Sequence, residues 1–206
     1  MMEEAKRVAE KLTGVGRPSA AEAQKLIRRR EPETFLFEDD GKTPNNPAFP
    51  LVLYRDAVGL PDEFDPAAVI EEIFGANGWG RGWRNGIFDF LHFHTQTHEV
   101  LGIASGEARV QFGGVQGRIL TVKTGDVVVL PAGTGHQRIA PAQGLLVVGA
   151  YPPQGKYDQP KPGEASEQAR LGLVAVRLPR DLLGHRARAS DIAAPPCSYV
   201  VVPIAE

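Results

Sequence analysis

The spacing of hydrophobic residues along the chain changes near residue 86. Before this point, two stretches have apolar residues at a spacing that is typical of helices, and short strand-like runs lie between them. Residues 1–31 are polar and predicted to be helical, and Ser19-Ala20-Ala21-Glu22 has the spacing of a helix-capping box. A second helix is predicted after Asp65-Pro66, because an aspartate cap and a proline in the first turn favour a helix start. This helix is expected to end near Gly75.

After residue 86, short apolar runs alternate with turns that contain glycine, which predicts a series of strands. The runs are Phe88 to His94, Glu99 to Ala104, Ala108 to Phe112, Arg118 to Val122, Asp126 to Leu130, His136 to Ile139 and Leu145 to Ala150. Further strand-like runs are Thr34 to Phe37, Leu51 to Tyr54, Leu173 to Leu178 and Tyr199 to Ile204. Strands this short and evenly spaced are typical of an antiparallel barrel or sandwich.

A glycine-rich segment, Asn77 to Gly86, separates the two halves and contains both tryptophans, Trp79 and Trp83. We interpret it as a loop. It could cover the mouth of a barrel, where aromatic side chains favour small organic ligands. Equally, the tryptophans could pack the N-terminal helix against the barrel. Trp83 is therefore a candidate substrate-binding residue.

Composition narrows the class of protein. The chain has 206 residues, of which 42% are hydrophobic and 23% charged, as expected for one globular domain with a modest extension. The net charge of −2 suits neither a nucleic-acid binder nor a polybasic membrane binder. No apolar run is long enough to span a bilayer, and the charged start lacks the apolar core of a signal peptide. The single cysteine, Cys197, allows no intrachain disulfide, so we expect a cytoplasmic protein.

Histidines gather in the β-rich half of the chain. His92 and His94 are two residues apart on a predicted strand, so both side chains should leave the same face. Imidazoles at that separation can converge on one metal ion. Glu99 follows after a predicted turn, and His136 begins another predicted strand. A closed fold could therefore bring three histidines and a carboxylate together.

Two blocks around these residues match a known pattern. The first reads Gly86-x5-His92-x-His94-x4-Glu99-x6-Gly106, and the second reads Gly125-x5-Pro131-x-Gly133-x2-His136. Together they resemble the two sequence motifs of the cupin superfamily, over residues 86–150. The wider pattern is similar to that of small single-domain bacterial cupins without an assigned reaction. It comprises Asp40-Gly41-x2-Pro44-Asn45-Asn46-Pro47, Trp83-Arg84-Asn85-Gly86 and the Gly-Ala-Tyr-Pro-Pro run from Gly149.

The resemblance implies a mainly β protein built on a double-stranded β-helix, the jelly-roll barrel of cupins. We expect residues 1–31 to form a helical extension and residues 32–152 to form the barrel, with a strand, a loop and a short helix before it. Residues 153–206 would pack on the barrel or on a partner subunit. The metal ligands implied by the motifs are His92, His94, Glu99 and His136. Ala140 stands where the second motif usually has an asparagine, which does not bind the metal, so this departure affects only the polarity near the site.

Strand alternation adds candidate residues to the pocket. If the two histidines of the first motif face inward, Phe88 and Phe90 should face inward as well, and Arg138 should enter the barrel beside His136. A guanidinium inside a barrel needs an acidic partner, since an unpaired buried charge is costly. One candidate partner is a carboxylate or phosphate group of the substrate. The alternatives are a carboxylate of the protein itself, or a position of Arg138 at the rim of the barrel.

Two further histidines are given other roles. His98 adjoins Glu99 and should face away from it, because Glu99 has the correct spacing to Gly106. We therefore place His98 behind the metal ligands or at the surface rather than on the metal. His185 lies outside both motifs and is interpreted as an ordinary structural or surface histidine.

Two functions fit this set of residues. The first is a metal-dependent enzyme with oxygenase, isomerase or lyase chemistry, acting on a small organic substrate that is anionic if Arg138 binds it. Three imidazoles and one carboxylate suit one divalent ion of iron, manganese, nickel, zinc or cobalt. The second is a module that binds or senses a small molecule, with the metal as a structural anchor. We expect no nucleic-acid or membrane partner, and a homodimer formed through sheet edges or terminal segments.

Overall fold

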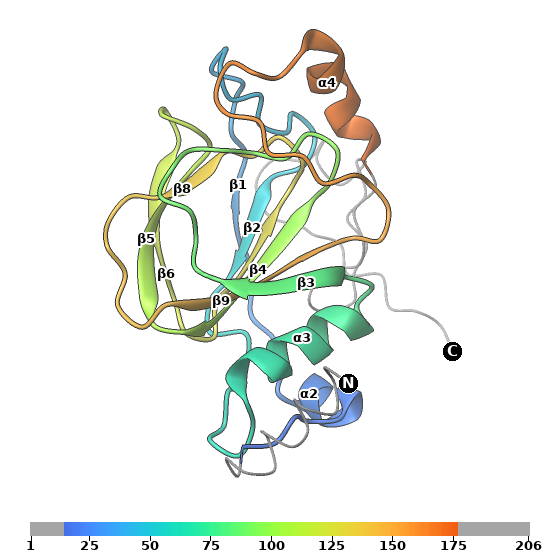
Figure 1. Ribbon diagram of the computed structural model, residues 1–206, viewed down its shortest axis with the longest axis vertical. Coiled ribbons are helices and arrows are strands. Elements are labelled where there is room, and N and C mark those ends of the chain that lie inside the picture. The colour runs from blue at the N-terminus through green and yellow to red at the C-terminus, as the bar shows by residue number, and fades with distance from the viewer. Residues whose placement is uncertain (1–14, 177–206) are drawn as a thin grey trace.

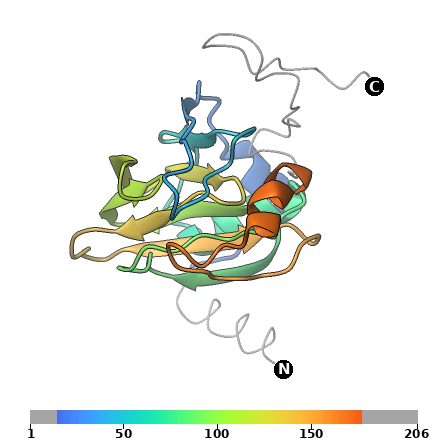
Figure 2. The same ribbon diagram turned by 90° about the horizontal axis from the view of Figure 1, so that it is seen from above.

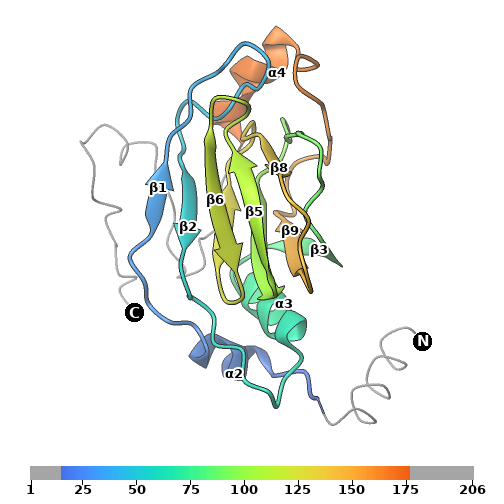
Figure 3. The ribbon, with the colours of Figure 1, turned by 90° about the vertical axis from the view of Figure 1, so that its left-hand side faces the viewer.

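The computed structural model describes residues 15–176, which form two antiparallel sheets that face each other (Figure 1). The larger sheet has the strand order β1 (Glu33–Phe35), β2 (Leu51–Tyr54), β7 (Val127–Leu130), β4 (Glu99–Ser105), β9 (Leu146–Tyr151) and β3 (Gly80–Asn85). The smaller sheet has the order β6 (Arg118–Lys123), β5 (Glu107–Phe112) and β8 (His136–Arg138). Figure 3 shows the smaller sheet flanked by β1 and β2 on one side and by β9 and β3 on the other. This arrangement is the double-stranded β-helix that the two motifs imply.

Alternate residues of the larger sheet point to opposite sides and build two separate cores. The inner core joins the two sheets and includes Leu53, Leu101, Val128, Val110 and Phe112. The outer core joins the larger sheet to helix α3 (Pro66–Ala76) and includes Val52, Val100, Val148, Ile70 and Phe74. Both faces of the larger sheet are covered, so strands β2, β4 and β7 are buried along almost their whole length.

The predicted helix starts are confirmed within the described part of the chain. Ser19 and Glu22 exchange the two hydrogen bonds of a capping box in front of α2 (Ala20–Lys25). Asp65 caps α3, and proline occupies the first turn of that helix. The two helices lie together at one end of the molecule (Figure 1). None of the helices in residues 15–176 is long and apolar enough to cross a membrane.

The glycine-rich segment differs from its prediction. Gly80–Asn85 is not a loop but strand β3, which pairs with β9 at the edge of the larger sheet. Backbone pairing overrides the turn-prone composition here. Trp79 is buried in the outer core, as the packing alternative predicts. Trp83 instead packs against the inner core.

Two predicted strands are also wrong. Phe88 to His94 bends at Asp89 and Phe90 and is not a strand. It forms an isolated bridge between His92 and His136, and the Phe88 carbonyl oxygen accepts from the Arg138 N–H at 2.7 Å. Leu173–Ala175 is a 3₁₀ helix, so the described part of the predicted strand from Leu173 is helical. The strand predicted at Tyr199 to Ile204 lies outside the described residues.

The described part of the C-terminal extension packs on the barrel. Helix α4 (Glu167–Gly172) lies beside the loop that connects β1 to β2, as the view from above shows (Figure 2). The Arg170 guanidinium joins them, because it pairs with the Asp39 carboxylate and donates to the Gly41 carbonyl oxygen at 3.1 Å. Packing of this extension on a partner subunit, and the homodimer, stay predictions.

The same loop is held to the barrel by two buried asparagines. Asn45 accepts a hydrogen bond from the Gly135 N–H, with 3.2 Å between oxygen and nitrogen. Asn46 donates one to the carbonyl oxygen of Ala132, at 2.9 Å. Both contacts fix the turn that immediately precedes His136, so the loop supports the position of a candidate ligand.

Replacing Asn46, which is 2% exposed, by alanine should lower the free energy of unfolding by about 2 kcal/mol. The substitution leaves the Ala132 carbonyl, and two backbone N–H groups that the Asn46 oxygen accepts from, without their partners. Urea denaturation measures the difference. Asn85→Ala, at an exposed position, is the matched control and should stay within about 0.5 kcal/mol of wild type. Equal small changes in both variants would contradict this role of Asn46.

Candidate metal centre

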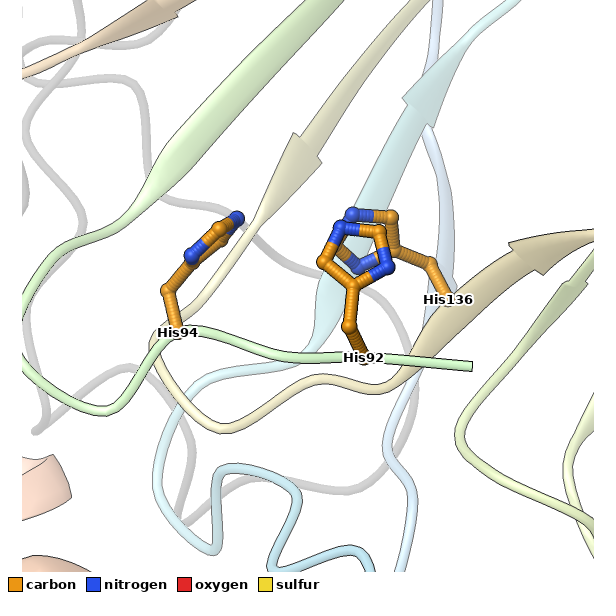
Figure 4. Close-up of side chains that lie close together, drawn as sticks. All are labelled: His92, His94 and His136. Atoms are coloured by element: carbon orange, nitrogen blue, oxygen red, sulfur yellow. The ribbon is translucent and has the colours of Figure 1, made fainter. Parts of the chain in front are cut away.

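Three buried histidines face a common space (Figure 4). His92 and His94 come from the extended segment after β3, and His136 is the first residue of β8. The ring centroids of His92 and His136 are 4.2 Å apart, and that of His94 lies 5.5 Å and 5.7 Å from them. One ring nitrogen from each histidine lies within 4.8 Å of the other two. This cluster could hold a metal ion.

Each of these imidazoles is held by a backbone carbonyl at its Nδ1. The contacts are His92 with Phe90 (3.2 Å), His136 with Thr134 (3.2 Å) and His94 with Asp158. Because a carbonyl oxygen can only accept, a neutral imidazole in this setting keeps its proton on Nδ1. Its Nε2 then has a free electron pair, which is the usual state of a histidine that binds metal.

Glu99, the first residue of β4, places a carboxylate against the cluster. Its Oε2 lies 3.2 Å from the Nε2 of His136 and 3.4 Å from the Nε2 of His94. The residue is 2% exposed, yet this oxygen has no hydrogen-bond partner in the described chain. Ligands that share one ion at roughly 2.0–2.2 Å lie about 3 Å apart. The unpaired oxygen and the neighbouring nitrogens therefore fit a bound metal ion.

Burial and neighbouring charges set the protonation of these groups. Burial, together with the nearby His136, lowers the pKa of His92 to about 3, so His92 is neutral at physiological pH. Burial alone would raise the pKa of Glu99, but His94 and His136 outweigh it and hold that pKa below its usual range. The Glu99 charge also outweighs burial at His94 and raises the pKa of that imidazole. The position between Glu99 and His94 thus favours a positive charge.

A cavity of about 230 Å³ opens onto the cluster. Its wall includes His92, Glu99 and His136 together with Trp83, Ile87, Phe88, Leu101, Tyr151 and Tyr157. Apart from the candidate ligands, this wall is dominated by aromatic and aliphatic side chains. The volume is below the range of roughly 300–1,000 Å³ that is typical of pockets for drug-sized ligands. The cavity therefore suits a smaller molecule.

Trp83 and Tyr151 connect the cavity wall to Glu99. The indole of Trp83 packs on Gly149 of β9, where any side-chain Cβ would collide with the ring. Trp83 Nε1 donates to the Tyr151 hydroxyl oxygen at 3.1 Å, and the Tyr151 hydroxyl lies within the influence of the Glu99 charge. Burial and the Glu99 charge raise the pKa of Tyr151, so its hydroxyl keeps its proton.

Phe88 and Phe90 lie at the mouth of the cavity rather than inside the barrel. They are 43% and 39% exposed, and their rings stack with centroids 4.9 Å apart. Phe88 lines the cavity and contacts His92 edge to face, with centroids 5.4 Å apart, whereas Phe90 is not part of the wall. Counting back in twos from His92 therefore places Phe88 correctly on the cavity but fails for Phe90, because this segment is not paired as a regular strand.

Arg138 lies outside this cavity. Its guanidinium donates to the carbonyl oxygens of Ile87 (3.1 Å) and Ala140 (2.7 Å), and it lies 4.0 Å from the Asp89 carboxylate. It lines a neighbouring surface hollow instead. Arg138 does not enter the barrel beside His136, because β8 ends at Arg138 and carbonyl groups take its N–H donors, so the alternative position at the rim is the one observed.

His98 is fully buried and has its own partners. Its Nδ1 accepts from the Ala132 N–H at 2.9 Å, and its Nε2 lies 2.9 Å from the carbonyl oxygen of Val176. Burial lowers the pKa of His98 to about 4. Both ring nitrogens are used, so His98 joins the turn before His136 to the end of the described chain and supports the site from behind.

Sequence reasoning missed Tyr151, Tyr157 and Asp158 as residues of the site. Tyr151 could have been found, because it lies two residues after Gly149 on β9 and therefore shares its face. Tyr157 and Asp158 lie in a polar, proline-rich stretch without a helical or strand period. No local pattern indicates that this stretch returns to the histidines.

The chain is similar to known proteins in sequence and in structure. No protein-family model matches the chain. Over 143 residues the chain is 41% identical to the uncharacterized protein YjlB of Bacillus subtilis (strain 168), and the match covers 68% of this chain and 83% of YjlB.

Two solved structures are also similar. Acireductone dioxygenase from Bacillus anthracis, with a cadmium ion in its active centre, is 19% identical at a TM-score of 0.33, over 43% of this chain and 62% of that one. An uncharacterized conserved protein with a double-stranded β-helix domain from Klebsiella pneumoniae is 16% identical at a TM-score of 0.30, over 68% of this chain and 87% of that one.

Because His94 and His98 have different contacts, replacing His98 should affect stability and replacing His94 should affect metal binding. His98→Ala should lower the free energy of unfolding by about 2 kcal/mol, because the Ala132 N–H and the Val176 carbonyl lose their partner. It should leave metal binding intact.

His94→Ala should weaken metal binding, because it removes one of the clustered nitrogens. Urea denaturation in the presence of a chelator measures stability, and elemental analysis after reconstitution measures bound metal. A folded His98→Ala variant that binds no metal would contradict this assignment.

Proposed function

The chain belongs to the family that includes YjlB of Bacillus subtilis, and from this premise and its cupin-like motifs we propose that it is a metal-dependent enzyme acting on a small organic molecule. The proposed ligands are His92, His94, His136 and Glu99. The observation that carries the proposal is the Glu99 carboxylate, which is buried without a hydrogen-bond partner for Oε2 beside two imidazole Nε2 atoms. A buried charge of this kind needs a counter-charge, and the clustered nitrogens are arranged to bind one.

The donor set limits the metal and the charge of the site. Three imidazole nitrogens and one carboxylate oxygen suit divalent iron, manganese, nickel, zinc or cobalt. Such an ion, when bound, supplies a Lewis acid and orients an oxygen atom of the substrate. An imidazole that binds a metal through Nε2 is neutral and Glu99 carries one negative charge, so a divalent ion held by these four residues would keep one net positive charge. This balance favours a substrate with a singly charged oxygen group, such as a carboxylate or an enolate.

The cavity wall favours an apolar body on that substrate. Trp83, Phe88 and Tyr151 offer ring surfaces to a molecule that lies against the cluster. Among the described residues of the wall, Arg84 is the one with a cationic side chain, and its guanidinium already pairs with Asp65 and Glu71. An anionic group on the substrate would therefore be held at the metal and not by an arginine.

Two small metal-binding probes test whether the metal holds the anionic group of a ligand while the cavity wall holds its apolar body. Protein loaded with Ni(II) should bind benzohydroxamate at least tenfold more tightly than acetohydroxamate. The phenyl ring buries apolar surface against Phe88 and Trp83, which is worth roughly 1.5 kcal/mol, about a tenfold change in affinity. Isothermal titration calorimetry measures both affinities.

Two variants serve as controls for the probes. Phe88→Ala should remove most of the difference between the two hydroxamates, because Phe88 lines the cavity. Leu36→Ala shortens a side chain that is 56% exposed and lies outside the cavity, so it should keep the difference. Equal affinity of the two probes for the wild type would contradict the proposed apolar wall. Equal affinity with and without Ni(II) would contradict the proposed metal site.

Turnover distinguishes an enzyme from a module that only binds or senses a small molecule. Protein loaded with iron is tested for oxygen uptake in the presence of small carboxylates and enolisable acids. Protein loaded with zinc, nickel or manganese is tested for isomerase and lyase products by NMR of the same compounds. Conversion of a compound that requires the metal and is lost in Glu99→Gln would support the proposal that the protein is an enzyme. Compounds that bind in a metal-dependent way but are never converted would favour the binding module.

A further inference from the structure

The segment that follows β9 crosses over the segment that carries His94. We call residues 153–160 the crossing segment. At one point Phe93 N–H donates to the Pro160 carbonyl oxygen at 3.2 Å. At another, Gly155 adopts a φ of +99° and packs so closely on Gln96 that a Cβ would collide with the Gln96 carbonyl oxygen. The two segments therefore fit together along their length.

The Asp158 carboxylate is the main anchor of this crossing. It accepts from the Thr95 N–H, with oxygen–nitrogen distances of 2.9 Å and 3.1 Å, and from the Thr95 hydroxyl. It also accepts from the Gln96 N–H at 3.3 Å. Hydrogen bonds to an ionised carboxylate are stronger than those between neutral groups, so this anchor fixes Asp158 relative to residues 94–96.

His94 depends on this anchor in a way that the other two histidines do not. The carbonyls that hold His92 and His136 belong to residues two positions earlier in the same segment. The carbonyl that holds His94 Nδ1 belongs to Asp158, 64 residues later in the chain. The orientation of His94 is thus set by tertiary structure, and that of its two neighbours is set locally.

We propose that Asp158 is a positioning residue for the metal centre. Its carboxylate clamps the crossing segment to Thr95 and Gln96, so that its own carbonyl holds the His94 Nδ1 proton and directs Nε2 toward the metal. This inference rests on the proposed metal-dependent function. The same clamp places Tyr157 in the cavity wall, with ring centroids 5.2 Å from His94 and 5.3 Å from Tyr151.

Asp158→Ala in the full-length protein tests the proposal. Its affinity for Ni(II), measured by competition with a chelator, should fall 10–100-fold, the usual cost of losing a group that orients a metal ligand. Glu164→Gln is the matched control, because Glu164 is an exposed acid nearby whose carboxylate accepts from the Lys161 N–H in its own turn. Its Ni(II) affinity should equal that of the wild type. Thr95→Ser, which keeps the hydroxyl, should also stay close to wild type, and Thr95→Val should be weakened.

A second measurement does not require the metal. Nitrogen-15 NMR of the metal-free protein at mildly alkaline pH reports which ring nitrogen of each histidine carries the proton. The wild type should show His94 with its proton on Nδ1, and Asp158→Ala should show a mixture of both tautomers at His94 with His92 unchanged. General loss of stability alone would not produce this selective change.

The outcomes separate this proposal from the proposed function. Unchanged Ni(II) affinity and an unchanged His94 tautomer in folded Asp158→Ala would overturn the positioning role. If Asp158→Ala does not fold, Thr95→Val decides by the same two measurements, because it deletes a single hydroxyl contact. The wild type could instead show no affinity for Ni(II) or any other divalent transition ion, while Asp158→Ala and Thr95→Val still lose the Nδ1 tautomer of His94. This result would contradict the metal-dependent function and support the positioning of His94 by Asp158.

Discussion

The buried carboxylate of Glu99 is the constraint on which the rest of the site depends. Taking an ionised group out of water costs several kcal/mol unless a counter-charge and hydrogen bonds replace the solvent. In the described chain the ion-pair partners of Glu99 are His94 and His136, and no lysine or arginine of residues 15–176 pairs with it. The divalent ion that we propose, shared with the imidazoles, would complete this arrangement, and the neighbouring imidazoles hold the pKa of Glu99 below its usual range.

His92 and His94 lie in an irregular segment and His136 lies where a turn meets β8, and buried polar side chains hold these parts of the chain in place. Asn45 and Asn46 hold the turn before His136, and His98 binds the same turn from the other side. Asp158 holds the segment of His94 in the same manner, through backbone N–H groups and a hydroxyl. The regular strands supply the two cores, but these hydrogen bonds, made far apart in the sequence, set the geometry between the candidate ligands.

Local sequence patterns predict this protein well where regular structure continues and poorly where it stops. The spacing of the two motifs brings three histidines and Glu99 together, since β4 and β8 begin at Glu99 and His136. Alternation fails for Phe90, which lies in the irregular segment before the isolated bridge, and for Arg138, where β8 ends. Asp158 could not be predicted, because its role depends on contacts with residues more than 60 positions away and leaves no period in the sequence.

Metal content is the most direct test of the central claim. The protein is purified without added metal, reconstituted with each candidate ion and measured by elemental analysis beside His92→Ala/His136→Ala. His185→Ala, which removes a histidine outside both motifs, is the control. We predict close to one divalent transition metal ion per chain in the wild type and in His185→Ala, and none in the double variant. A wild type that takes up no metal, or a folded double variant that keeps the wild-type amount, would contradict the claim that these histidines and Glu99 form a metal centre.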